Sequence, residues 1–239
     1  MANINKKCLI VDSSGVRPFV FAETKLGLSS GVLEKFFNYN SLDLRLGSTA
    51  INEFAFRYNP QESLFSVPLD PLSLGAPYKN ISISLSDAGY FSLTNNNTDR
   101  FSIYALNAKV SNQSRLWELS PYWELLSSQD QAVISLAISA SKTYDEVAIL
   151  TNDKHLRQQC FNFEGISTYG SCSMLAGVVL TGFITYQKGM YIYQKWFEEE
   201  PRWIPYQKNE YGIKRKLKFG EVLAIERQRM RKGNSFWTP

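Results

Sequence analysis

The sequence contains few residues that bind metals through sulfur or nitrogen. Among its 239 residues it has three cysteines, Cys8, Cys160 and Cys172, and a single histidine. The cysteines are odd in number and form neither a C-x-x-C pair nor a Cys/His cluster, which argues against a structural zinc site. The lone histidine argues against a Ser-His-Asp triad. The simplest interpretation is three reduced thiols in a cytoplasmic protein.

The chain also lacks a long apolar run. No stretch approaches the ~18 apolar residues that a membrane span requires, so we predict no membrane partner. The N-terminal segment MANINKKCLIVDSSG contains an aspartate and no small-residue cleavage site, so we interpret it as a first strand and not as a signal peptide. A hydrophobic content of 44% with 20% charged residues is typical of a soluble globular protein.

Charge is unevenly distributed along the chain. The net charge is +4, yet residues 201–239 contain ten Lys or Arg and three Glu, whereas residues 1–200 contain 16 basic and 19 acidic residues. We interpret 201–239 as a basic C-terminal extension, in which Lys214, Arg215 and Lys216 are candidate RNA contacts. A solvated helix face at 221–232 followed by a frayed tail explains the same charges equally well.

Two apolar runs of strand length each end at a carboxylate. Residues 8–11 (CLIV) are followed by Asp12, and residues 147–150 (VAIL) are followed by Thr-Asn and then Asp153. Buried parallel strands are continuously apolar because helices cover both faces of their sheet. Open α/β sheets place their sites beyond the carboxyl ends of the strands. The sequence therefore predicts a parallel sheet with Asp12 and Asp153 at one edge.

A third carboxylate belongs to a predicted helix. Apolar residues recur at helical spacing over 133–140, which indicates a helix with one buried face. Ser128 and Gln131 form an S-x-x-Q capping box, so we expect the helix to begin near Ser128. Asp130 then lies in the first turn, where the helix dipole favours its charge.

The remaining segments alternate between helical and extended patterns. We predict helices at 28–39, 50–56, 173–180 and 186–200, and strands at 42–46 and 165–170. Residues 57–120 contain several prolines, and apolar and polar residues alternate there around an Asn-Asn-Asn turn. We interpret this stretch as antiparallel β structure that forms an insertion or a small hairpin subdomain.

Several phrases in this order resemble the PIN-domain family, which includes the ribonuclease toxins of bacterial toxin–antitoxin pairs. They are LIVDSS, an acid in the helix after the second strand, QDQAVISLAISAS, AILTNDKHLR and GISTYGSCSMLAGVVLTGFIT. The match covers roughly residues 7–56 and 122–197. The resemblance implies a three-layer α/β sandwich with a central, mainly parallel sheet, formed by residues 1–56 and 121–200, with the β-rich segment 57–120 inserted.

The resemblance also implies a site. Its metal ligands and catalytic residues are Asp12, Glu53, Asp130 and Asp153, with Ser14, Thr151 and Asn152 as supporting residues. Glu34 mimics the phrase around the second acid, but it leaves too few residues after Asp12 for a helix and a strand, so Glu53 is favoured. The family often has a further acid just beyond the last aspartate, where this sequence has Lys154 and His155.

The implied activity is endoribonucleolytic cleavage with Mg²⁺ or Mn²⁺, leaving a 5′-phosphate and a 3′-hydroxyl. Hard divalent ions take oxygen ligands, and converging carboxylates repel one another unless a cation lies between them. Lys154 and Arg157, which follow Asp153, are candidate contacts to RNA phosphates or are solvated helix residues. The resemblance further implies a cytoplasmic toxin, an inhibitory partner protein and a homodimer.

Two other functions fit the same residues. A catalytically inactive PIN-like module for RNA binding or assembly is consistent with the basic residues beyond Asp153. A phosphohydrolase of the haloacid dehalogenase type also begins with an apolar strand that ends at an aspartate. That family requires a second aspartate two residues later, where Ser14 stands.

Overall fold

A computed structural model describes residues 6–46, 82–85, 90–94, 103–106, 126–161, 163, 165–208 and 211–238. Glu53 and the predicted helix at 50–56 lie outside these ranges. The elements up to the middle of the chain are β1 (Lys7–Val11), α1 (Ser13–Lys25), α2 (Ser30–Tyr39), β2 (Leu42–Leu46), β3 (Ser82–Leu85), β4 (Tyr90–Thr94) and β5 (Ile103–Leu106). The later elements are α5 (Ser128–Ala140), β6 (Glu146–Leu150), α6 (Lys154–Cys160), β7 (Ile166–Tyr169), α7 (Ser171–Leu180), α8 (Tyr186–Glu199), the 3₁₀ helix η3 (Pro201–Trp203), β8 (Tyr206–Lys208), β9 (Lys214–Lys216) and α9 (Phe219–Arg231).

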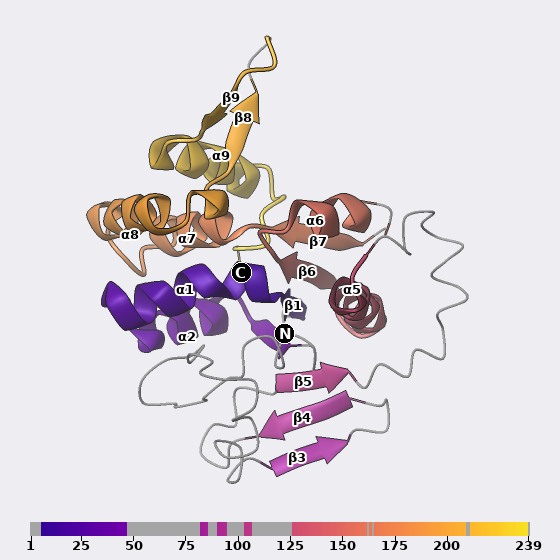
Figure 1. Ribbon diagram of the computed structural model, residues 1–239. Coiled ribbons are helices and arrows are strands. Elements are labelled where there is room, and N and C mark those ends of the chain that lie inside the picture. The colour runs from indigo at the N-terminus through magenta and orange to yellow at the C-terminus, as the bar shows by residue number, and fades with distance from the viewer. Residues whose placement is uncertain are drawn as a thin grey trace.

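A parallel sheet lies at the centre of the molecule (Figure 1). Its strand order is β2-β1-β6-β7, and every neighbouring pair is parallel. The two strands predicted from continuous apolar runs, β1 and β6, are adjacent, with Val11 paired to Leu150. This confirms the prediction of an α/β fold with a parallel sheet.

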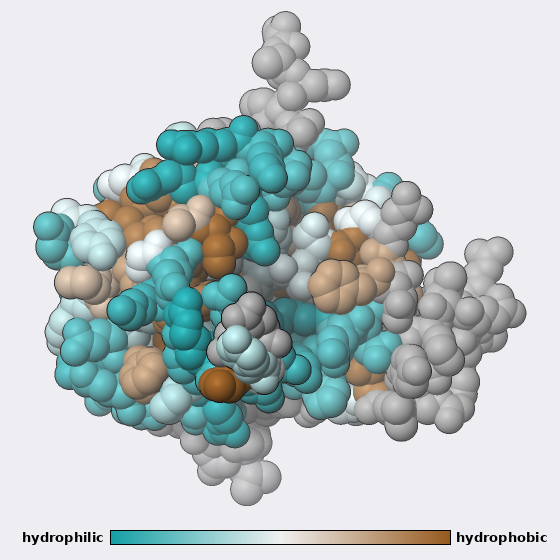
Figure 2. All heavy atoms as spheres, turned by 90° about the horizontal axis from the view of Figure 1, so that it is seen from above, coloured by the Kyte–Doolittle hydropathy of each residue, from teal (hydrophilic) through white to brown (hydrophobic). Residues whose placement is uncertain are grey.

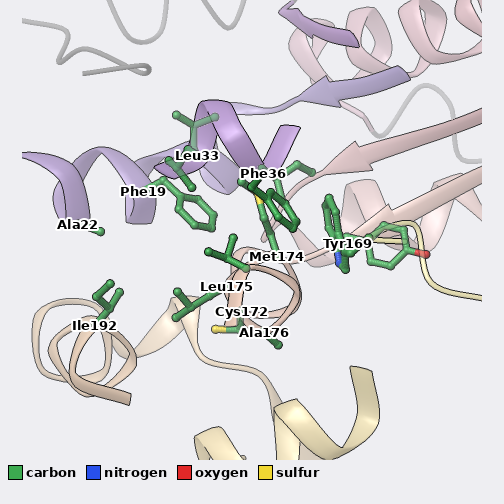
Figure 3. Close-up of a cluster of buried hydrophobic side chains, with 14 of the residues drawn as sticks. Phe19, Ala22, Leu33, Phe36, Tyr169, Cys172, Met174, Leu175, Ala176 and Ile192 are labelled. Carbon is green, nitrogen blue, oxygen red and sulfur yellow. The ribbon is translucent and has the colours of Figure 1, made fainter. Parts of the chain in front are cut away.

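Both faces of the sheet are covered by helices. Leu9 and Val11 of β1 belong to a core that includes residues of α1, α2, α7, α8 and α9. Cys8 and Ile10 of the same strand belong to a second core with α5 and α6. Because successive side chains of a strand point to opposite faces, a strand buried on both sides must be apolar throughout. Figure 3 shows the first core, where Phe19, Leu33, Leu175 and Ile192 converge from four helices.

The segment predicted to be antiparallel β structure contains a three-stranded sheet. Its order is β3-β4-β5, and both pairs are antiparallel. This confirms an antiparallel sheet within residues 57–120. Strand β5 contacts β2, the edge strand of the parallel sheet.

Helix α1 directly follows Asp12 and has no counterpart among the predicted helices. Its sequence, SSGVRPFVFAETK, contains a glycine and an internal proline, Pro18. Both residues disfavour a helix on local propensity, and proline also removes an N–H donor. The predicted helix at 28–39 is confirmed as α2, so two helices connect β1 to β2, and Glu34 lies on the second of them.

The C-terminal residues pack against the body of the protein. Trp237 has no exposed surface, and its ring lies against Gly177 of α7, where an added Cβ would stand 2.8 Å from the indole Cγ. The Trp237 indole N–H donates to Ser173 Oγ over 3.1 Å. At the start of β1, the buried Lys7 ammonium donates to the carbonyl oxygens of Phe236 and Thr238. The segment after α9 is therefore part of the first core.

Figure 2, a view from above, shows a surface that is largely hydrophilic with smaller apolar areas. Within the described parts of the chain, no helix combines the length and the apolar character needed to cross a bilayer. All three cysteines are buried and unpaired.

Candidate functional site: a carboxylate edge

The strand order has a topological switch point at the carboxyl edge of the sheet, between β1 and β6. From β1 the chain crosses outward to β2, whereas from the adjacent β6 it crosses outward in the other direction to β7. Loops that leave in opposite directions open a crevice between two neighbouring strand ends, which is where α/β sheets bind ligands. The Asp12 N–H donates to the Leu150 carbonyl over 3.1 Å, so Asp12 and Thr151 leave the sheet side by side.

Asp12 is the N-cap residue of α1 and is held through one oxygen only. Its Oδ2 accepts hydrogen bonds from the Ser14 N–H (3.2 Å), the Ser14 hydroxyl (2.5 Å) and the Thr151 hydroxyl (2.7 Å). The side chain is largely buried, with the residue 9% exposed. Within the described part of the chain, Oδ1 has no hydrogen-bond donor. Asp12 thus has a fixed orientation and one carboxylate oxygen available for another ligand.

Ser14 and Thr151 connect the first aspartate to the last. While Ser14 Oγ donates to Asp12, it accepts the N–H groups of Asn152 (2.9 Å) and Asp153 (3.1 Å). Thr151 Oγ1 likewise accepts the Asp153 N–H over 3.0 Å. The two hydroxyls are 3.1 Å apart. These bonds place the backbone of Asp153 directly beside the Asp12 carboxylate.

Asn152 satisfies a carbonyl group that Pro18 leaves without its helical partner. In a regular α-helix residue 18 would donate to the carbonyl of residue 14, but proline has no N–H. The Asn152 side-chain amide donates to the Ser14 carbonyl instead, over 2.9 Å. Pro18 is therefore tolerated inside α1, because the carbonyl that it leaves unpaired accepts a hydrogen bond from Asn152 in the loop after β6.

Ser171 completes this hydrogen-bond network and was not predicted. It is fully buried at the start of α7, its N–H donates to Asn152 Oδ1 (3.0 Å), and its hydroxyl donates to the Gly15 carbonyl (2.7 Å). The signal that could have identified it is its place just after a third parallel strand, the same kind of position that Asp12 and Thr151 occupy.

Asp153 is the N-cap of α6. Its Oδ1 accepts the N–H groups of His155 (2.6 Å) and Leu156 (3.0 Å). As at Asp12, the other oxygen has no hydrogen bond within the described ranges. The two predicted aspartates therefore combine the same features: one oxygen caps a helix, and the second is left over.

Asp130 lies in the first turn of α5, as predicted, and Ser127 caps the start of this helix. The Ser127 hydroxyl donates to Asp130 Oδ2 (2.8 Å) and accepts the Asp130 N–H (3.1 Å). Gln131, the expected partner of Ser128, donates to the Leu126 carbonyl. The Ser127 hydroxyl is thus bonded to both the side chain and the backbone N–H of Asp130 at the start of α5.

The charges of the three aspartates interact. Burial raises the pKa of the Asp130 carboxyl, the hydrogen bond from Ser127 opposes this rise, and the negative charges of Asp153 and Asp12 raise the pKa further. Asp12 and Asp153 are thus both within electrostatic range of Asp130.

The donor set fits a hard divalent cation, although the carboxyls do not form a chelating cluster. Within the described ranges, no group of three or more His, Cys, Asp or Glu side chains stands close enough to hold a metal ion. Glu53, the fourth predicted acid, lies outside the described residues. The carboxylate oxygens left over at Asp12 and Asp153, and the raised pKa of Asp130, indicate negative charge that a cation at this edge would offset.

The predicted RNA-binding residues divide into two groups. Arg215 forms a two-bond ion pair with Glu221 (2.6 and 2.8 Å), and the Lys216 ammonium donates to the carbonyls of Pro201 and Ile204. Lys214 lies over the Tyr206 ring. In contrast, the side chains of Lys154 and Arg157 on α6 make no hydrogen bond or ion pair with the described residues, and α6 begins directly after Asp153.

Fold and site together define an α/β protein with three aspartates around the crevice of a parallel sheet. No protein-family model matches the chain, and no curated protein or solved structure is similar enough to match it.

The raised pKa of Asp130 predicts how its charge affects stability. Because the folded protein holds this proton more tightly than the unfolded chain, stability falls as pH rises from the ordinary aspartate value to the raised one. Asp130→Asn removes this loss. From about pH 3 to about pH 7 we expect the variant to gain stability relative to wild type, by less than about 1 kcal/mol because the carboxyl is partly solvated.

Urea denaturation of the metal-free protein at both pH values measures this difference. Asp145→Asn is the matched control, because Asp145 is an exposed carboxyl just before β6, at the end of the strand opposite to Asp153. A relative stability of Asp130→Asn that declines with rising pH would contradict the assigned direction.

Proposed function

We propose that this protein is a metal-dependent endoribonuclease of the PIN type. The observation that carries the proposal is the pair of strand-end aspartates, Asp12 and Asp153, each anchored through one oxygen and each with a second oxygen free of donors in the described structure. The separate cores on the two faces of the sheet support a three-layer sandwich. The order of acids along the chain supports the PIN assignment.

The residues present fit the divalent ion that this function requires. Asp12, Asp153 and Asp130, with Glu53 as the predicted fourth acid, would hold Mg²⁺ or Mn²⁺ through carboxylate oxygens. When bound, such an ion stabilises negative charge on the phosphoryl group and lowers the pKa of the attacking water. Cleavage of the bond from phosphorus to the 3′ oxygen by that water leaves a 5′-phosphate and a 3′-hydroxyl.

The contribution of the protein is positional. Ser14 and Thr151 hold Asp12 and the Asp153 backbone in one rigid network, so little reorganisation is required when the substrate binds. Lys154 and Arg157 lie on the helix that Asp153 caps, which places positive charge next to the acids for the RNA backbone. The anionic strand thus has an attractive surface beside an edge that would otherwise repel it.

A non-catalytic RNA-binding module is the second candidate. It is favoured by the fact that the described acids do not form a group able to hold a metal ion. In that case the hydrogen-bond network at the crevice would serve only to stabilise the fold, and α6 would still present its basic residues.

The test is incubation of the full-length protein with end-labelled single-stranded RNA in Mg²⁺ or Mn²⁺. We expect cleavage that stops on addition of EDTA and is absent in the double variant Asp12→Asn/Asp153→Asn. Binding of RNA without cleavage under any of these conditions would favour the non-catalytic module. Cleavage that persists in the double variant would exclude the proposed site.

A further inference from the structure

A pocket of about 610 Å³ adjoins the carboxylate edge. It lies between α6, the start of α7, η3 and α9, and its lining begins at Asn152 and Lys154, on either side of Asp153. A volume of this size is in the range of small-molecule sites. The pocket therefore extends from the start of α6, next to Asp153, toward the C-terminal part of the chain.

The lining of the pocket is strongly basic. Its charged residues are Lys154, Arg157, Arg202, Lys216, Arg229 and one acid, Glu226. The acid is already fully engaged, because Glu226 accepts hydrogen bonds from Ser173 (2.8 Å), Ser235 (2.5 Å) and Arg229 (3.3 Å). The carboxylate thus offers little repulsion to an incoming anion.

Three of the five cations are also engaged. Arg202 pairs with Glu200 at 2.7 Å, Arg229 pairs with Glu226, and the Lys216 ammonium is held by backbone carbonyls. Lys154 and Arg157 are the two that have no such partner within the described structure. The charge that is still unbalanced lies at the end of the pocket nearest Asp153.

Arg157 is the more unusual of the two because it is partly buried. Its Nη1 lies 3.7 Å from the position that a Cβ on Gly170 would take, so the guanidinium reaches the start of α7. Burial lowers the pKa of Arg157, and the charge of Asp153 opposes that change. A partly dehydrated cation without a hydrogen-bonded counter-ion is stabilised by an anion that supplies both charge and acceptors.

Aromatic rings also line the pocket, and Lys214 lies over one face of one of them, Tyr206. Trp203 and Tyr206 contribute to the lining, and Tyr206 is 42% exposed. Nucleobases stack on such rings with little dependence on base identity. A basic group and an exposed ring in one cavity match a nucleotide, which has a phosphate at one end and a flat apolar base at the other.

We propose that this pocket binds the nucleotide next to the scissile phosphate of single-stranded RNA, with Arg157 bound to its phosphate and Tyr206 against its base. Only the position of the scissile phosphate in this inference depends on the proposed nuclease function. Binding to the pocket itself requires no metal ion and no cleavage.

The test is binding of a fluorescently labelled RNA pentanucleotide to the full-length protein in EDTA, followed by anisotropy. We expect Arg157→Gln to weaken binding about 10-fold or more, because it removes a charge-assisted contact. The slope of log K against log salt should become less steep by about 0.7, the value for one phosphate contact on a single strand. Arg227→Gln, an exposed arginine of α9 outside the pocket, removes the same charge and should change binding less than about 3-fold.

Competition by small ligands tests the base contact and separates a strand from a free nucleotide. We expect adenosine monophosphate to compete better than inorganic phosphate, and Tyr206→Ala to remove that advantage. We expect the pentanucleotide to bind more tightly than adenosine monophosphate. Equal competition by phosphate would overturn the base contact, and equal affinity for the mononucleotide would reassign the pocket to a free nucleotide.

This result and the proposed nuclease activity can fail separately. RNA cleavage together with equal binding by Arg157→Gln and Arg227→Gln would overturn the pocket assignment and leave the nuclease proposal intact. Loss of binding specific to Arg157→Gln, without cleavage by wild type, would support the pocket and reject the nuclease.

Discussion

Asp12→Asn is expected to reduce RNA cleavage by about 10³-fold, equivalent to about 4 kcal/mol of transition-state stabilisation. Asparagine retains an oxygen that can accept the hydrogen bonds from Ser14 and Thr151, which now go to Oδ2. Its amide group then replaces Oδ1, the oxygen without a donor. An amide N–H₂ cannot ligate a cation. The substitution therefore removes one metal ligand and keeps the hydrogen bonds that orient the side chain of residue 12.

Initial rates of cleavage at saturating Mg²⁺ measure the effect, and thermal denaturation confirms that the variant is folded. Asp145→Asn is the matched control, since Asp145 is an exposed carboxyl that accepts the Lys6 N–H over 2.9 Å. We expect its cleavage rate to equal that of wild type. Comparable rates for Asp12→Asn and Asp145→Asn would remove Asp12 from the proposed machinery.

Gly15→Ala is expected to destabilise the protein by about 3 kcal/mol or more, because it forces overpacking against backbone. A Cβ at this position would stand 2.2 Å from the Leu150 carbonyl oxygen and 2.6 Å from its carbon. Neither atom can rotate away, so α1 must move from the end of β6. That movement would break the bonds that hold Asp12 to Thr151 and Asn152 to Ser14.

Urea denaturation measures this effect, and Gly220→Ala is the matched control. Gly220 lies in the first turn of α9, and an added Cβ there would meet nothing within 4 Å. Alanine favours helix over glycine by up to about 1 kcal/mol, so we expect the control to be neutral or slightly stabilising. A Gly15→Ala variant as stable as Gly220→Ala would show that α1 does not need its close approach to β6.

The strands that carry the two strand-end aspartates could be predicted because their signal is local. Continuous apolar runs at 8–11 and 147–150 indicate burial on both faces, and both appear as central parallel strands. The polar residues that follow these strands, Ser14, Thr151 and Asn152, were also predicted to support the aspartates. The antiparallel strands of the insertion were recognised from their alternating pattern.

Helix α1 could not be predicted because the residues that permit it lie far away in sequence. Gly15 and Pro18 disfavour a helix when only local propensity is considered. The carbonyl that Pro18 leaves unpaired is satisfied by Asn152, 138 residues after Ser14. The requirement for glycine at position 15 is equally non-local, because the backbone that excludes a side chain there belongs to Leu150.

The C-terminal segment was also only partly predictable. Its excess of basic residues indicated a nucleic-acid contact or a solvated face, yet several of these cations are used within the protein. Arg215 pairs with Glu221, and Lys216 holds backbone carbonyls. Trp237, at the end of the chain, fills the space above Gly177. These partners could not be assigned from charge counts, since counts contain no information on which groups meet.

By itself the sequence determined that two apolar strands end at aspartates, that a third aspartate begins a buried helix, and that the basic residues concentrate near the C-terminus. These are properties of short segments, where the periodicity of burial and the chemistry of caps act between near neighbours. Only the tertiary structure decided which carboxylate oxygen of each aspartate is engaged, how Pro18 is accommodated, and that Arg157 lies unpaired in a pocket beside Asp153. Hydrogen-bond direction and burial depend on packing between segments more than a hundred residues apart, and this packing is absent from any local pattern.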